Sequence, residues 1–107
     1  MAKNFRIKLL VPESLKIGVR ESTKINCKSF DELIIDLCNR ISRPKNFQDN
    51  YQPNYNGEYD RIIDYRVSED ARIKFFTFAA VFKNSYHTLD YLINGEKNSR
   101  IGRIVSS

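Results

Sequence analysis

Residues 5–13 carry the sequence Phe5-Arg6-Ile7-Lys8-Leu9-Leu10-Val11-Pro12-Glu13, in which apolar side chains recur at every second position before a proline. Such alternation predicts a β-strand with a buried face of Ile7, Leu9 and Val11. Pro12 ends the strand, because proline has no backbone N–H for a sheet but fits the first turn of a helix. The stretch therefore predicts a strand that leads directly into a helix.

The predicted first helix starts at Glu13. Leu15 and Val19 recur along it at helical spacing, and the pair Asn26-Cys27 marks its end. Helices often end on a residue in the left-handed conformation, which asparagine tolerates better than most residues do. We therefore expect Asn26 to supply the left-handed turn.

A second helix is predicted to open on Ser29-Phe30-Asp31-Glu32, which has the form of a capping box. In this arrangement the Ser29 hydroxyl accepts from the Glu32 amide, and the Glu32 side chain returns to the Ser29 amide. The apolar positions of this helix fall on one side, at Phe30, Ile34, Leu37, Cys38 and Ile41.

The 107 residues, 41% of them hydrophobic, are enough for one small domain or for two half-domains that share a core. Lys and Arg outnumber Asp and Glu by 18 to 13. The excess lies in residues 1–46, with ten basic and five acidic side chains, whereas residues 47–107 have eight of each. A basic first half favours contact with a polyanion.

Residues 59–107 repeat the pattern of residues 1–42 in degenerate form, across a polar segment at 43–58 that is predicted to be a surface linker. Placing Val67-Ser68-Glu69 over Val11-Pro12-Glu13, an offset of 56 positions, aligns the strand at 61–67 with the first strand. With three extra residues in the intervening helix, Thr88 then aligns with Ser29 at the start of the second helix. An unrelated oligomerisation segment at 59–107 is the alternative.

This order of strand, turn, helix, break and helix, with the residues quoted above, resembles the ribbon-helix-helix family of DNA-binding proteins, which includes Arc and MetJ. The resemblance covers residues 5–41 well and 59–93 weakly. It implies a mainly α fold in which two β-α-α units pair their strands into a two-stranded antiparallel ribbon that enters the DNA major groove. Two such units on one chain would form a pseudo-dimer, similar to TraY.

The resemblance implies that the outward side chains of the ribbon contact bases, and alternation selects them. They are Arg6, Lys8 and Leu10 on one strand and Ile62, Asp64 and Arg66 on the other. Pairing about the central residues would place Lys8 opposite Asp64, which could neutralise it. Arg6 would face Arg66, and Leu10 would face Ile62, an end suited to thymine methyl groups. An asymmetric DNA target is expected.

The amino end of the second helix in each unit is where the family holds a DNA phosphate. Lys28 and Ser29 stand at this point in the first unit, and His87 and Thr88 in the second. Ordinary helix capping is an alternative role for the same residues. Basic residues of the tail, Lys97, Arg100 and Arg103, could add phosphate contacts or remain in solvent.

Residues 75–82 are apolar on almost every side if they are helical, so we expect this run to be buried on more than one side. Ala71, Phe75, Phe78 and Phe82 would complete the core. Part of the segment 71–82 could instead contact a second copy of the chain or another protein. A β-strand over the run 75–82 is the other possibility, and it would break the repeat.

The residues indicate a cytoplasmic protein without a cofactor or metal. The amino terminus lacks the apolar core of a signal peptide, and no apolar run approaches ~18 residues. Cys27 and Cys38 are expected to be reduced, and His87 is the single histidine, so a zinc site or a histidine triad lacks parts. No nucleophile with a base and an orienting group is recognisable, and we expect no enzyme.

The leading functional hypothesis is sequence-specific binding of double-stranded DNA, as a transcriptional repressor or as an accessory factor in DNA processing. Family habit suggests an origin in a mobile element or phage. The alternative is an antitoxin or another inhibitory protein whose half from residue 47 on binds a protein partner. The balance of charge in that half and its aromatic residues favour this second hypothesis.

Overall fold

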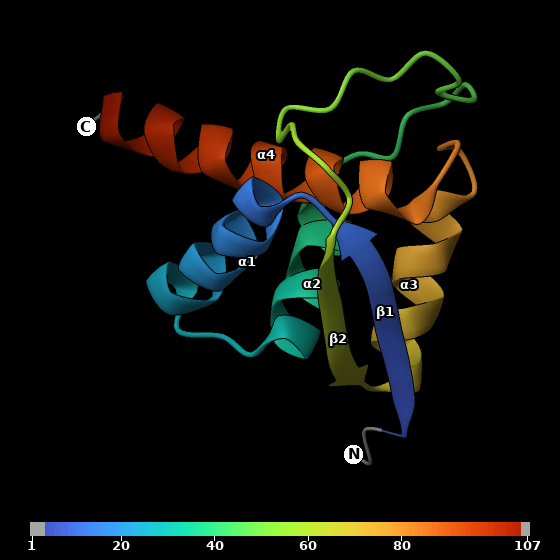
Figure 1. Cartoon of the computed structure of the whole chain (residues 1–107). Coiled ribbons are helices and arrows are strands. Elements are labelled where there is room, and N and C mark those ends of the chain that lie inside the picture. The colour runs from blue at the N-terminus through green and yellow to red at the C-terminus, as the bar shows by residue number, and fades with distance from the viewer. Residues whose placement is uncertain (1–3, 106–107) are drawn as a thin grey trace.

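The computed structural model describes the backbone of residues 4–105 and the side chains of residues 4–98. Two strands and four helices follow one another in this part of the chain (Figure 1). They are β1 (Phe5–Val11), α1 (Glu13–Asn26), α2 (Phe30–Arg40), β2 (Arg61–Val67), α3 (Glu69–Ala79) and α4 (Ser85–Val105). The expected strand, helix and helix after residue 4 are confirmed, and residues 69–79 are helical rather than extended.

The two strands form an antiparallel ribbon. Lys8 lies opposite Asp64, and Arg6 lies opposite Arg66, as expected from the resemblance. Both strands have the same sequence of buried and exposed positions along their seven residues. The face turned to the helices consists of Ile7, Leu9, Val11, Ile63, Tyr65 and Val67. Alternation predicted the buried face of the ribbon, because a slip of one residue would expose every apolar side chain. The register itself was expected from the resemblance.

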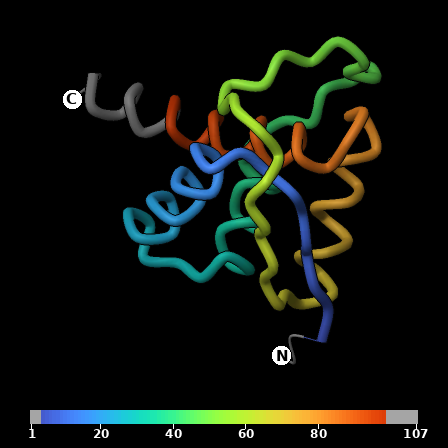
Figure 2. Tube along the Cα trace, viewed as in Figure 1, coloured from blue at the N-terminus to red at the C-terminus, as the bar shows by residue number. Residues whose placement is uncertain are grey.

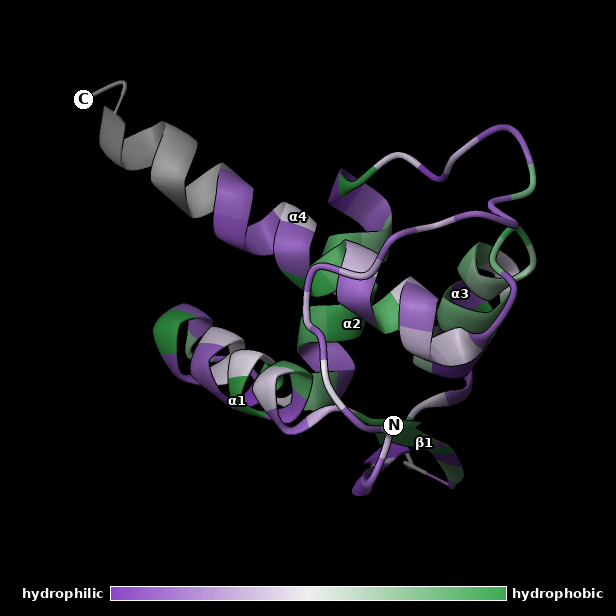
Figure 3. Ribbon diagram, turned by 45° about the horizontal axis from the view of Figure 1, so that its top comes forward, coloured by the Kyte–Doolittle hydropathy of each residue, from purple (hydrophilic) through white to green (hydrophobic). Residues whose placement is uncertain are grey.

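The core lies between the inner face of the ribbon and the helices. In Figure 3, hydrophobic residues are concentrated on α2 at the centre of the molecule, with α1, α3 and α4 around it. Phe75 of α3 is fully buried, and Phe78 and Phe82 are almost so. The segment 71–82 thus contributes to the core as expected. The expectation that the run 75–82 is buried on more than one side is wrong, because Phe76 on its other side is exposed, as is Ile73.

Helix α1 ends on Cys27, which adopts the left-handed conformation with φ 53° and ψ 43°. The Lys28 amide donates to the Thr23 carbonyl and the Cys27 amide to the Lys24 carbonyl, which is the pattern of a Schellman end. The expectation that Asn26 makes this turn is wrong, because Asn26 stays helical. Its side chain instead donates to a carboxylate oxygen of Glu96 at 3.1 Å.

We predict that Cys27→Gly stabilises the protein by about 1 kcal/mol, because glycine has no Cβ to clash in a left-handed turn. Urea unfolding of the reduced protein would measure the change. Cys27→Ala is the matched control, since it removes the thiol but keeps the Cβ and should leave stability nearly unchanged. Equal stability of the glycine and alanine variants would contradict the strain at this position.

Helices α2 and α4, which correspond to the two predicted second helices, begin differently from each other. Ser29 caps α2, since its hydroxyl accepts from the Glu32 amide at 3.3 Å, as predicted. The Glu32 side chain, however, accepts from the Ser29 hydroxyl at 3.0 Å rather than from the Ser29 amide. Helix α4 begins at Ser85, one turn earlier than the predicted start at Thr88. Asn84 provides its cap, because its side-chain oxygen accepts from the His87 amide at 3.0 Å.

The polar segment between α2 and β2 is attached to α4 more firmly than a surface linker would be. Figure 2 traces it across the amino-terminal part of α4. The carboxylate of Asp90, fully buried in α4, accepts hydrogen bonds from the Tyr51 hydroxyl at 2.6 Å, the Asn54 amide at 3.0 Å and the Tyr55 amide at 2.8 Å. Tyr55 also packs on Gly18 of α1, where an added Cβ would lie 3.1 Å from the ring, closer than an ordinary contact.

Helices α1 and α4 are joined by a second buried carboxylate. Glu96 is fully buried, and its two oxygens accept from the Ser22 hydroxyl at 3.0 Å and from the Asn26 side chain at 3.1 Å. A buried carboxylate requires such donors, because desolvation of the charge is otherwise costly.

The helices described are all too short or too polar to cross a bilayer.

Candidate nucleic-acid interface

Six side chains form the outer face of the ribbon and point away from the core: Arg6, Lys8, Leu10, Ile62, Asp64 and Arg66. All six are exposed, as the alternation predicted. The two aliphatic ones keep more than half of their surface in solvent, 56% for Leu10 and 51% for Ile62. A two-stranded ribbon with such a face can present side chains to an external surface without unfolding any part of the core.

Charge on the outer face is concentrated at one end. Arg6 and Arg66 lie opposite each other there, and Leu10 lies opposite Ile62 at the other end. The single carboxylate, Asp64, approaches the Arg6 guanidinium at 3.5 Å and not the Lys8 ammonium facing it across the ribbon. The expectation that Asp64 neutralises Lys8 is therefore wrong. Lys8 makes no ion pair within the part of the chain that the structure describes.

The start of α2 lies beside β2. The Phe30 ring stacks on Tyr65, with ring centroids 4.3 Å apart, and the buried Asp31 carboxylate accepts from the Ser68 amide at 2.7 Å. Lys28 and Ser29 are partly exposed at this point. The two residues predicted to contact phosphate in the first unit are thus at the surface beside the ribbon.

Both of these residues already have protein partners. The Lys28 ammonium lies 3.2 Å from the Asp36 carboxylate, and the Ser29 hydroxyl bonds to Glu32. A hydrogen bond from Arg40 lowers the pKa of Asp36, burial opposes this effect, and Lys28 adds to the lowering. Asp36 therefore holds Lys28 as a charged partner, and contact with an external anion would have to compete with it.

His87 and Thr88 occupy a different environment from the one expected. They lie in the first turn of α4, where Thr88 is fully buried and His87 is 8% exposed. The His87 ring lies between Tyr51 of the polar segment and Tyr86, with ring centroids 5.4 and 5.2 Å away. In this arrangement their side chains face the interior rather than a phosphate, because the helix starts a turn earlier than predicted.

Burial lowers the pKa of His87, the Asp90 carboxylate opposes this shift, and the Lys83 ammonium adds to it. The folded state therefore binds the His87 proton less readily than the unfolded state does. We predict that stability is complete above pH 6.5, the ordinary value, and falls as the pH decreases from there toward the lowered folded pKa. Urea midpoints between pH 8 and pH 5 would show the fall. It should be smaller in His87→Gln, and an identical pH profile in that variant would contradict the assignment.

Other predicted contacts lie away from the ribbon or outside the described side chains. Lys97 is exposed on α4, whereas the side chains of Arg100 and Arg103 fall outside the described residues. Both cysteines are free, as expected. Burial raises the pKa of Cys38 to about 11, with the Lys74 ammonium opposing the shift, so this thiol stays protonated near neutral pH.

The sequence pattern did not indicate the residues that adjoin the apolar end of the outer face. Tyr59 precedes β2 and Tyr86 belongs to α4, and their rings meet edge to face with centroids 4.6 Å apart. Together with Leu10 and Ile62 they line a hollow in the surface. The run Tyr59-Asp60 before the strand gave no periodic signal, and only the folded chain brings it beside α4.

No family model, curated protein or solved structure matches this chain.

Proposed function

We propose that the protein binds double-stranded DNA by placing the outer face of the ribbon in the major groove. The observation that carries the proposal is the ribbon itself, which buries one set of alternate side chains and exposes the other, three of them cationic. The major groove admits a two-stranded ribbon, and arginine is the side chain best suited to pair with a guanine edge. Arg6, Lys8 and Arg66 would meet bases, and a regulator or DNA-processing factor would use them to select a site.

The two halves of the chain support a pseudo-dimer of the ribbon-helix-helix kind. Aligning Phe30 with Leu89 places the buried positions of α2 over buried positions of α4. The matched pairs are Phe30 and Leu89, Asp31 and Asp90, Leu33 and Leu92, Ile34 and Ile93, and Leu37 and Glu96. Two copies of one unit would produce this correspondence, with each copy supplying half of the core that neither could complete alone.

A single-chain ribbon with unlike strands would favour an asymmetric DNA site. The arginine end can donate to guanine, whereas the end with Leu10 and Ile62 can only make apolar contact, for which the thymine methyl group is the available partner in the groove. Asp64 lies between the two ends, and its ion pair with Arg6 partly neutralises the charge of that arginine. The proposed target is therefore guanine-containing on one side and thymine-containing on the other.

The test is a selection of bound duplexes from a random-sequence pool, followed by affinity measurements at two salt concentrations. An enriched asymmetric motif with affinity that falls steeply with salt would support the proposal. Salt-dependent binding with no enriched motif would support non-specific contact with the backbone and overturn sequence-specific reading. Absence of binding at low salt would overturn the proposal as a whole.

A second candidate function is inhibition of a protein partner. The observation that favours it is a set of exposed apolar side chains on α3 and at the start of β1, namely Ile73, Phe76 and Phe5, with the Arg72 guanidinium over both aromatic rings. Arginine and aromatic residues are common at protein interfaces. Purification with and without nuclease separates the candidates, because co-purifying DNA supports the first and a stoichiometric protein supports the second.

A further inference from the structure

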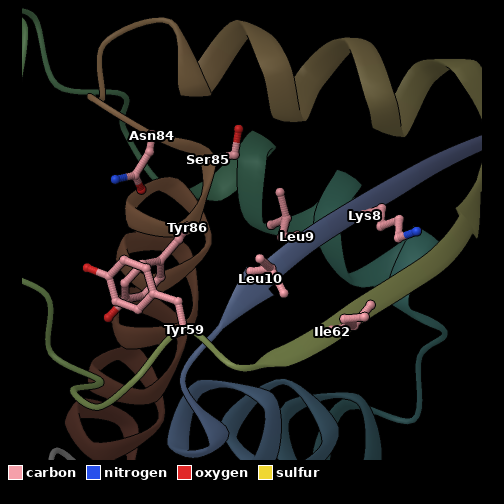
Figure 4. A pocket seen from close by; sticks show the side chains of 8 residues that line it. All are labelled: Lys8, Leu9, Leu10, Tyr59, Ile62, Asn84, Ser85 and Tyr86. Carbon is pink, nitrogen blue, oxygen red and sulfur yellow. The ribbon is translucent and has the colours of Figure 1, made fainter.

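A pocket of about 620 Å³ opens where the apolar end of the ribbon meets the start of α4 (Figure 4). We call it the tyrosine pocket, and it is lined by Lys8, Leu9, Leu10, Tyr59, Ile62, Asn84, Ser85 and Tyr86. Its volume is within the range of small-molecule sites, about 300–1,000 Å³, and its lining is mostly apolar with a few polar groups, which is also typical of them.

The two ends of the tyrosine pocket differ in chemistry. At one end the rings of Tyr59 and Tyr86 stand edge to face, and the residue Tyr59 is 52% exposed. At the other end is Lys8, whose ammonium lies on the far side of the pocket from the two rings (Figure 4). Aromatic rings favour another ring against them, and an ammonium favours an anion.

The charge of the pocket lining determines whether an anion or a cation is favoured as the occupant. Lys8 is the one charged residue among those that line the pocket, and the lining includes no Asp or Glu. The carboxylate opposite it, Asp64, is engaged by Arg6 instead. A cationic occupant would therefore meet an ammonium without a compensating carboxylate in the wall, whereas an anion would gain a partner.

We propose that the tyrosine pocket binds a small aromatic carboxylate, with its ring against Tyr59 and Tyr86 and its carboxylate at Lys8. Leu10, Ile62 and Lys8 also belong to the outer face of the ribbon. A bound molecule would cover them and weaken DNA binding, and this second effect rests on the proposed function. The pocket would make the ribbon responsive to a metabolite of that chemical class.

Binding is tested without DNA, using indole-3-butyrate, the matched neutral amide and the matched primary amine as probes in ¹H–¹⁵N spectra. We expect saturable shifts at the pocket residues with the carboxylate, at a dissociation constant below about 1 mM. The amide should bind about fivefold more weakly, since an exposed ion pair contributes up to about that factor. Lys8→Met should remove the preference for the anion, whereas Lys45→Met, in the exposed polar segment, should keep it.

Tyr59→Ala should weaken all three probes by about tenfold, because each loses the ring contact. Shifts that do not saturate, or that map away from the pocket, would overturn the proposal. Equal binding of the carboxylate and the amine would overturn its choice of an anion.

Competition with a selected duplex is the last measurement. A carboxylate that binds the pocket but leaves DNA affinity unchanged would overturn the regulatory effect alone, and a protein that binds the carboxylate but no DNA would overturn the proposed function alone.

Discussion

Asp90→Ala is expected to destabilise the fold by about 3 to 5 kcal/mol, because each buried donor left without an acceptor costs about 1–3 kcal/mol. The carboxylate accepts from the Tyr51 hydroxyl, from the amide and the side chain of Asn54, and from the Tyr55 amide. Burial, followed by the Asp90 carboxylate, raises the pKa of Tyr51, so its hydroxyl stays a donor throughout the neutral range. Urea unfolding measures the loss.

Two variants make the Asp90 test specific. Asp90→Asn keeps one acceptor oxygen and should lose roughly half as much stability. Asp49→Ala removes an exposed carboxylate from the polar segment itself, and should stay within about 0.5 kcal/mol of the parent. Hydrogen exchange at the Asn54 and Tyr55 amides should accelerate in Asp90→Ala. A loss below about 1 kcal/mol, with exchange unchanged, would show that the segment is held by other contacts.

The double variant Arg6→Ala/Arg66→Ala is expected to bind the selected DNA at least about 30-fold more weakly, since each lost guanine contact costs about 1–3 kcal/mol. Both side chains are exposed and neither supports the core, so the fold should be retained. Of the two single variants, Arg6→Ala should cost more. It also leaves the Asp64 carboxylate without its 3.5 Å partner, and this charge would then repel the DNA.

Arg20→Ala/Arg43→Ala is the control for that measurement, because it removes the same charge from exposed positions on α1 and in the polar segment. It should lower affinity only slightly and equally for all sequences. If the ribbon variant has the same affinity and salt dependence as this control, the outer face is not the surface that contacts DNA. Circular dichroism of both variants establishes that the helices are intact.

The sequence predicted the two strands well because their signals are local. Alternation at Ile7, Leu9 and Val11, with Pro12 after it, indicates the first strand, and the same alternation at Ile63, Tyr65 and Val67 indicates the second. Their pairing and register were expected from the resemblance. The capping position of Ser29 was also local and correct. These features follow from backbone hydrogen bonding and the pleat, which do not depend on the rest of the chain.

The remaining features depend on contacts between distant residues. Asn84 is a good helix cap, but the alignment with Ser29 drew the predicted start to Thr88 instead. Asp90 and Glu96 look like solvent-facing residues of a polar helix, and only the folded chain brings Tyr51, Ser22 and Asn26 to them. The tyrosine pocket likewise combines residues from both strands and α4. Contacts between such distant residues leave no local pattern in a single sequence.

Because both strands of the ribbon belong to one polypeptide, a substitution alters one side of the exposed face and leaves the other as it was. In a symmetric homodimer the same codon change would appear twice and alter both sides together. Lys8 facing Asp64 across the ribbon is a pairing that two identical strands could not make about their centre. A single-chain ribbon thus allows its two sides to change one residue at a time, with each intermediate form keeping one side unchanged.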